Sequence, residues 1–64
     1  MNKYHYYFEC DIQTNEAIGL CKEFPFLSAF AKTPDTAIKR IKLLVKFNVE
    51  WMIEDGEKLP EVQN

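Results

Sequence analysis

Three acidic residues are the side chains of this sequence that could support phosphoryl-transfer chemistry. They are Glu9, Asp11 and Glu23. Two-metal catalysis needs several clustered carboxylates that hold two ions about 4 Å apart. Asp11 falls in a predicted turn, and the helix predicted further along the chain offers an apolar face to its neighbours instead of a second acidic group. We therefore expect no nuclease site.

Two cysteines and one histidine are the remaining candidates for metal binding or nucleophilic catalysis. A structural zinc site takes four ligands at short paired spacings, which Cys10, Cys21 and His5 do not provide. The two cysteines lie in neighbouring predicted strands and could face each other only if the turn were centred near Asn15-Glu16. We expect buried free thiols. Nothing places His5 beside Ser28 as a base, so the sequence predicts no enzyme, no metal and no cofactor.

Three strands and one long helix follow from the residue pattern. They are predicted over residues 4–10, 17–23, 27–31 and 34–55. Thr33 is a favourable N-cap, Pro34 suits the first helical turn, and Gly56 is a typical stop signal. Residues 59–62 predict an extended tail or a short edge strand. The expected fold is a single α+β domain spanning residues 1–64, in which a three-stranded antiparallel meander packs on one C-terminal helix (β-β-β-α).

The predicted helix carries more apolar side chains than one sheet face can cover. At about 100° per residue, one stripe faces the sheet and consists of Ala37, Ile38, Ile41, Leu44, Val45, Asn48 and Met52. A second ridge, formed by Leu43, Phe47 and Trp51, is offset from this stripe. We expect this ridge and one face of the first strand to remain exposed. Because a domain of this size buries only roughly 60% of its unfolded surface, we expect a homo-oligomer, either a dimer or a tetramer.

The charges are unevenly distributed along a chain whose formal net charge is −2. Basic residues cluster early in the helix, at Lys39, Arg40, Lys42 and Lys46. Acidic residues then dominate, with Glu50, Glu54, Asp55, Glu57 and Glu61 opposed only by Lys58. An acidic C-terminal third suits a basic protein partner, although the same pattern also fits a solvated helix face. The basic cluster and the aromatic first strand leave RNA binding open as an alternative, which the net charge disfavours.

The N-terminal residues are not followed by the apolar segment of a signal peptide. No apolar run approaches the roughly 20 residues that a membrane span needs. We therefore expect a cytoplasmic protein that does not enter a membrane.

Three motifs in fixed order resemble the HicB family of antitoxins. They read Glu23-Phe24-Pro25-x-Leu27-Ser28-Ala29-Phe30, Thr33-Pro34-x-x-Ala37-Ile38 and Ile53-Glu54-Asp55-Gly56-Glu57-x-Leu59-Pro60-Glu61. The chain departs from the family pattern in the first hairpin, where Thr14-Asn15 replaces Asp-Gly. It departs again at Ala31, where glycine is frequent, and at Phe26, where the family carries an acidic or small residue.

The resemblance implies a truncated ribonuclease-H-like fold and a role in blocking a small basic HicA-like toxin that cleaves messenger RNA. Many family members add a DNA-binding domain, but this chain stops directly after its Leu-Pro-Glu element, so we do not expect direct operator binding. The expected interface, with a partner or with a second copy, comprises Leu43, Phe47, Glu50, Trp51, Glu54 and Asp55. The alternative is an oligomeric structural or regulatory protein without a toxin.

Overall fold

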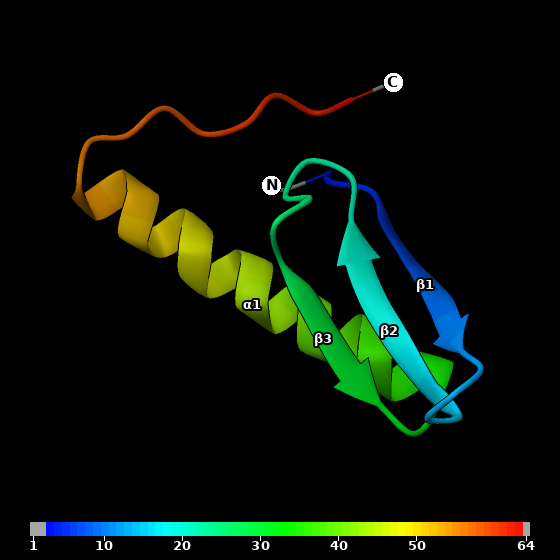
Figure 1. Cartoon of the computed structure of the whole chain (residues 1–64). Coiled ribbons are helices and arrows are strands. Elements are labelled where there is room, and N and C mark those ends of the chain that lie inside the picture. The colour runs from blue at the N-terminus through cyan, green and yellow to red at the C-terminus, as the bar shows by residue number, and fades with distance from the viewer. Residues whose placement is uncertain (1–2, 64) are drawn as a thin grey trace.

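A computed structural model describes residues 3–63 and shows a three-stranded sheet packed on one long helix (Figure 1). The elements are β1 (Tyr6–Asp11), β2 (Glu16–Cys21), β3 (Ser28–Ala31) and α1 (Pro34–Glu54). The sheet order is β1-β2-β3, and both pairs of neighbouring strands are antiparallel. The predicted β-β-β-α meander is therefore confirmed. The predicted strand boundaries were wrong by one or two residues, chiefly because β1 begins at Tyr6 and not at Tyr4.

The β1–β2 connection is a polar hairpin loop that the Asp11 side chain stabilises. Its carboxylate accepts a hydrogen bond from the backbone N–H of Gln13 at 2.9 Å, and Asn15 N–H donates to the carbonyl oxygen of Asp11 at 2.8 Å. Asn15 adopts a φ of 58°, a left-handed conformation that asparagine tolerates better than most residues. The Asn15 found here can therefore close the turn without glycine.

Helix α1 begins and ends at the signals found in the sequence. The Thr33 hydroxyl accepts a hydrogen bond from Thr36 N–H at 3.2 Å, which satisfies one of the free N–H groups of the first turn. At the other end, Gly56 has a φ of 73°, where a residue with a Cβ would be strained. Residues 57–63 form an extended tail without a strand, so the edge strand considered for this segment is absent from it.

Small residues on one face of the sheet let α1 approach closely. Ala17, Ala29 and Ala31 are buried there, and Gly19 lies directly against the helix backbone. A Cβ built on Gly19 would overlap the carbonyl oxygen of Ala37 and lie 2.8 Å from its carbonyl carbon. This face of β2 and β3 is therefore the one that meets α1. By the strand register, Tyr6, Phe8 and Cys10 lie on the same side of the sheet.

The core sits between this sheet face and the middle of α1. Its central side chains are Tyr4, Cys21, Phe24, Ala29, Ile41 and Val45. Phe24 is fully buried, and the ring of Tyr4 meets it edge-on with centroids 5.2 Å apart, a favourable aromatic geometry. The predicted helix stripe is confirmed for Ala37, Ile41 and Val45.

Two burial predictions were wrong. Leu44 is 38% exposed, because it lies at the border of the stripe and the narrow sheet does not reach it. Cys10 is exposed while Cys21 is buried. Cys10 lies in an edge strand, beyond the part of the sheet that α1 covers, and its register partner is Ala17, not Cys21.

Candidate protein-binding surface

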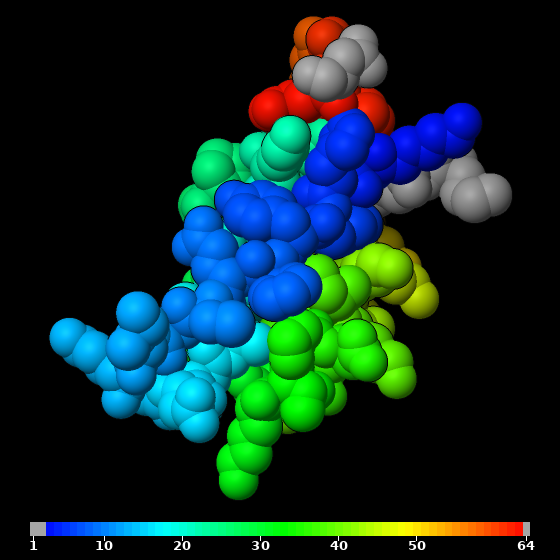
Figure 2. Space-filling model, turned by 90° about the vertical axis from the view of Figure 1, so that its right-hand side faces the viewer, coloured from blue at the N-terminus to red at the C-terminus, as the bar shows by residue number. Residues whose placement is uncertain are grey.

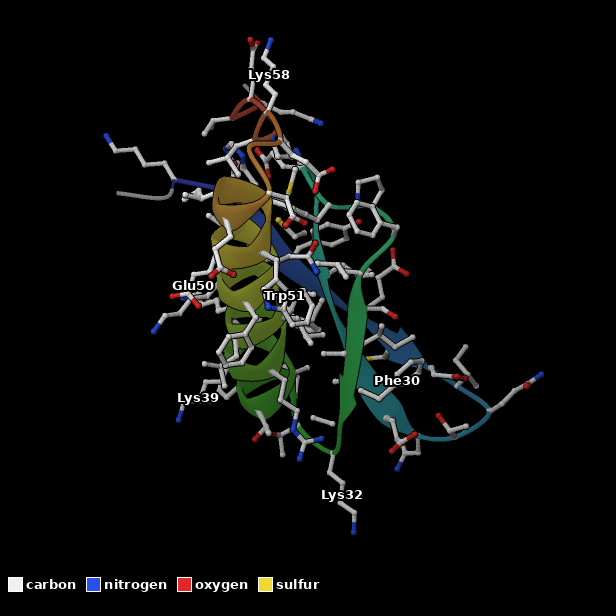
Figure 3. The ribbon with its side chains drawn as sticks, turned by 90° about the vertical axis from the view of Figure 1, so that its left-hand side faces the viewer. Phe30, Lys32, Lys39, Glu50, Trp51 and Lys58 are labelled. Carbon is white, nitrogen blue, oxygen red and sulfur yellow. The ribbon has the colours of Figure 1, made fainter. Side chains whose placement is uncertain are left out.

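The largest run of uncovered apolar side chains on α1 lies on the flank of the helix beside β3. We call Leu43, Leu44, Phe47 and Trp51 the helix patch. Their exposed fractions are 52%, 38%, 50% and 64%, respectively. Figure 3 shows Trp51 on the helix side that borders β3, with Phe30 pointing away from α1 on the sheet. Contiguous exposed apolar surface of this kind marks interaction sites more often than a scattered single residue does.

The helix geometry explains why these four side chains stay outside the core. With about 100° per residue, Leu44, Trp51 and Phe47 fall successively further from the buried centre of the stripe near Ile41. The sheet has only three strands, and β3 is four residues long. It ends before it could cover this flank, so the exposure expected for Leu43, Phe47 and Trp51 is confirmed.

Arg40 joins the helix flank to β3. Its guanidinium donates a hydrogen bond to the carbonyl oxygen of Phe30 at 2.6 Å. Ile18 faces Phe30 in the register, and the alternation of antiparallel pairs directs this carbonyl to the outside of the sheet. Arg40 thus bonds to the Phe30 carbonyl group, which would otherwise be a free acceptor at the outer edge of β3. The same bond ties the flank of the helix that carries the helix patch to this strand.

Carboxylates border the C-terminal half of the helix patch. Glu50 and Glu54 are exposed, and the helical angle places Glu54 between Leu43 and Phe47. Asp55 is the C-cap and turns about 100° away from Glu54. Glu50 and Glu54 therefore lie beside Phe47, at helical spacings of three and seven residues. Asp55 follows Trp51 by four residues and lies on the same flank of the helix, with its backbone N–H bonded to the carbonyl oxygen of Trp51.

This acidic end is electrostatically unfavourable for the isolated helix. The last turn of α1 contains no basic residue, although carboxylates near the negative end of a helix macrodipole are destabilising and cations are stabilising. Lys58 does not compensate for these charges, since its ammonium lies 3.9 Å from Glu61 and both side chains are 86% exposed. Ion pairs of that kind contribute little. A cationic group placed here by another molecule would be stabilised.

The basic residues of α1 do not form one surface. Arg40 bonds to β3, whereas Lys42 lies on the opposite flank with its ammonium 5.6 Å from the centre of the Tyr6 ring. Lys39 and Lys46 point between these two directions, away from the sheet. The positive charge that RNA binding would use beside stacked aromatic rings is therefore divided among three sides of the helix, and only Lys42 lies beside an aromatic residue of β1.

Glu23 makes the most side-chain hydrogen bonds of any polar residue within residues 3–63, and the sequence did not reveal this role. Its side chain is fully buried and accepts hydrogen bonds from the backbone N–H of His5 at 2.9 Å and of Gln63 at 2.8 Å. His5 Nδ1 lies 2.8 Å from the second carboxylate oxygen. Since an ionised carboxylate only accepts, Nδ1 carries the hydrogen. A signal was present in the sequence: Glu23 directly precedes Phe24 and follows Cys21 by two residues, and both of these neighbours belong to the core.

The electrostatics of Glu23 follow from these contacts. Burial by itself raises the pKa of Glu23, but the hydrogen bonds from Gln63 and His5 outweigh it and lower the pKa to about 2. Burial also raises the pKa of the neighbouring Cys21 thiol, which donates to Glu23 at 3.6 Å. Glu23 therefore remains ionised and ties the C-terminal tail to the start of the sheet.

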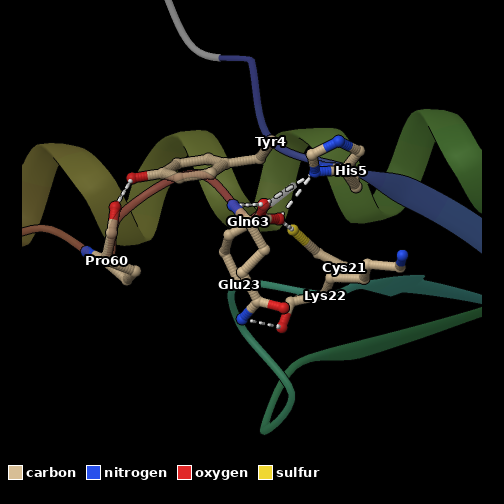
Figure 4. Close-up of polar contacts among 7 residues, drawn as sticks. All are labelled: Tyr4, His5, Cys21, Lys22, Glu23, Pro60 and Gln63. Carbon is tan, nitrogen blue, oxygen red and sulfur yellow. Dashed lines mark hydrogen bonds and ion pairs between the residues drawn. The ribbon is translucent and has the colours of Figure 1, made fainter.

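A second contact holds the same tail. The Tyr4 hydroxyl donates to the carbonyl oxygen of Pro60 at 2.7 Å (Figure 4). Gln63, Glu23, His5 and Tyr4 thus fasten residues 60–63 beside the N-terminal end of β1 (Figure 4). These contacts form a structural anchor in which both carboxylate oxygens of Glu23 accept hydrogen bonds.

The described residues contain no group of three or more His, Cys, Asp or Glu side chains that could hold a metal ion. Within residues 3–63, no helix combines the length and apolar character needed to cross a membrane. Comparison of the chain with protein-family models, curated proteins and solved structures finds no match.

Proposed function

We propose that this chain is a non-enzymatic, cytoplasmic protein-binding module, and that it acts as a HicB-like antitoxin. In this role the helix patch and its bordering carboxylates bind a small basic HicA-like toxin and cover its RNA-cleaving site. The observation that carries the proposal is the coincidence of exposed Phe47 and Trp51 with Glu50 and Glu54 at the negative end of α1.

The two components of this surface would contribute differently to binding. Large aromatic side chains that become fully desolvated supply most of the free energy of an interface. Carboxylates at its border attract a basic partner and raise the association rate more than the affinity. The truncated ribonuclease-H-like fold and the motif order of the HicB family agree with the β-β-β-α arrangement, which supports the proposal at the level of the fold.

The direct test is to determine whether a neighbouring reading frame encodes a short basic protein, to co-express that protein with this chain, and to measure complex formation and RNA cleavage. We expect a stable complex in which cleavage of messenger RNA is suppressed. If the neighbouring protein neither binds nor cleaves RNA, the antitoxin role is excluded. A stand-alone oligomeric role or a small RNA-binding role would then be the remaining candidates.

We expect Phe47→Ala and Trp51→Ala each to weaken toxin binding about 30-fold or more, since truncated interface anchors cost roughly 2 kcal/mol or more. Neither change should alter the unfolding midpoint appreciably, because both side chains are at least half exposed. Titration calorimetry and thermal unfolding measure the two quantities. Ile53→Ala is the matched control, because Ile53 is 62% exposed on the same helix but turned about 160° away from Trp51. Equal affinities for all three variants would place the interface elsewhere.

A further inference from the structure

The outer edge of β1 is an open pairing surface. Lys22 N–H donates to the carbonyl oxygen of His5 at 3.0 Å. His5 therefore directs its carbonyl group at the β2 side, one residue before the first register pair, Tyr6 with Cys21. Since hydrogen-bonded and non-hydrogen-bonded pairs alternate in antiparallel strands, Tyr7 and Glu9 also direct their backbone groups at β2. The N–H and C=O groups of Tyr6, Phe8 and Cys10 therefore point outward, and in residues 3–63 no other strand pairs with them.

A hollow adjoins this edge on the side of the helix. It has a volume of about 580 Å³ and is lined by Tyr6, Tyr7, Phe8, Ile38 and Lys42. Figure 2 views this side of the molecule, with β1 in blue beside α1 in green, and the red tail lies above the strand without covering its edge. Phe8 is 47% exposed and Tyr7 is 41% exposed. An added strand would thus gain both backbone partners and an apolar hollow for its side chains.

The charges of β1 and of the residues just before it favour a second copy of this chain as the added strand. Lys3 and His5 precede the strand, whereas Glu9 and Asp11 lie at its end. An antiparallel copy brings the basic end of one strand against the acidic end of the other. This self-complementarity is what a two-fold symmetric interface requires, and a strand of uniform charge would lack it.

We propose that two copies of this chain pair antiparallel through β1, with Tyr7 on the two-fold axis, to form a continuous six-stranded sheet. This register places His5 opposite Glu9 of the second copy and Lys3 opposite Asp11. It also places Tyr6 opposite Phe8, so that both aromatic rings enter the hollows above Ile38 and Lys42. A register centred on Glu9 would instead oppose two carboxylates, which is destabilising.

The alternation of hydrogen-bonded and non-hydrogen-bonded residue pairs along β1 agrees with this register. Tyr6 and Phe8 both direct their N–H and C=O groups outward, so they form a hydrogen-bonded pair across the new interface. Tyr7 then forms a non-hydrogen-bonded pair with its symmetry mate, with Cα atoms about 4.5 Å apart. The helix patch lies beside β3, on the other side of the molecule, and remains available to a different partner.

The first test is the oligomeric state of the full chain by sedimentation across a concentration series. Paired edges and four half-exposed aromatic rings cover less than the roughly 800 Å² per partner of a standard interface. We therefore expect a reversible dimer with a dissociation constant in about the micromolar range, weakened by salt. A protein that stays monomeric at millimolar concentration would overturn the proposal.

Proline substitution tests which edge is used. Phe8→Pro removes an outward N–H of β1, and Phe30→Pro removes one from the outer edge of β3, so both positions tolerate proline in principle. We expect Phe8→Pro to raise the dissociation constant at least tenfold and Phe30→Pro to leave it unchanged, with circular dichroism confirming that both variants fold. Equal effects of the two substitutions would rule out β1 as the interface.

Disulfide trapping tests the register and remains informative if Phe8→Pro fails to fold. In a Cys10→Ser background, Tyr7→Cys should form a disulfide-linked dimer under mild oxidation, since its Cα separation suits a disulfide. Glu9→Cys in the same background is the control, because two Glu9 positions lie four residues apart in this register. Trapping of Glu9→Cys as efficient as that of Tyr7→Cys would overturn the Tyr7-centred pairing. The outcome is independent of toxin binding, which the preceding co-expression experiment measures.

Discussion

Gly19→Val is expected to prevent folding of the domain, or to destabilise it by at least about 3 kcal/mol. The reason is that a Cβ at this position would overlap the carbonyl oxygen of Ala37. The obstructing atoms belong to the helix backbone and not to a flexible side chain, so α1 would have to move away from the sheet. A 64-residue chain has a total stability of only about 3–10 kcal/mol. Urea unfolding followed by circular dichroism measures the loss.

Gly56→Ala is the matched control for this prediction. Gly56 has nothing within 4 Å of the position that a Cβ would take, but its φ is 73°. We expect only the cost of a strained backbone there, about 1–2 kcal/mol, and an intact fold. If Gly19→Val unfolds at the same urea concentration as Gly56→Ala, then α1 does not approach β2 as closely as described.

Glu23→Gln is expected to destabilise the domain by roughly 2–4 kcal/mol and to release the C-terminal tail. A carboxamide cannot accept from all the donors that converge on Glu23, because its NH₂ group would face the N–H of Gln63 or of His5. Leaving buried donors without acceptors carries a cost of this size. Urea unfolding measures the free energy, and amide exchange at Gln63 reports the tail. Glu61→Gln, at an exposed carboxylate, should change neither.

The same carboxylate determines how stability depends on acid. The pKa of Glu23 falls from an ordinary value of 4.5 to about 2 in the folded chain. A group with a depressed folded pKa stabilises the fold fully above its unfolded pKa, and that contribution is lost as the pH falls through the folded pKa. We expect stability to decline between about pH 4.5 and pH 2. Glu23→Gln should lose less across this interval, and parallel curves for the two proteins would contradict the assignment.

The elements of this fold could be predicted because each has a local signal. Thr33 and Gly56 delimit the helix, and the spacing of Ala37, Ile41 and Val45 identifies its buried stripe. The exposure of Phe47 and Trp51 followed from a geometric argument, namely that one stripe of a helix covers one face of a narrow sheet. These predictions depend only on residues close together in the sequence, or on how much of a helix surface one sheet face can cover.

The features that the sequence did not reveal depend on contacts between distant segments. Glu23 is buried because its partners come from residues 5 and 63, and a period-two strand pattern carries no information about them. Cys10 shares a sheet face with Cys21, yet only Cys21 lies above the helix. The face that meets α1 had a signal in the small side chains of Ala17 and Gly19. That signal becomes decisive only once the strand register is known.

The hydrogen bond from Arg40 to Phe30 has a consequence for how far association can proceed. It occupies an outward acceptor of β3, and β3 is only four residues long, so this margin of the sheet is a poor template for another strand. A sheet with two receptive margins could add molecules without limit and grow into fibrils. With one margin a poor template, growth through the proposed pairing of β1 would end once that edge is filled.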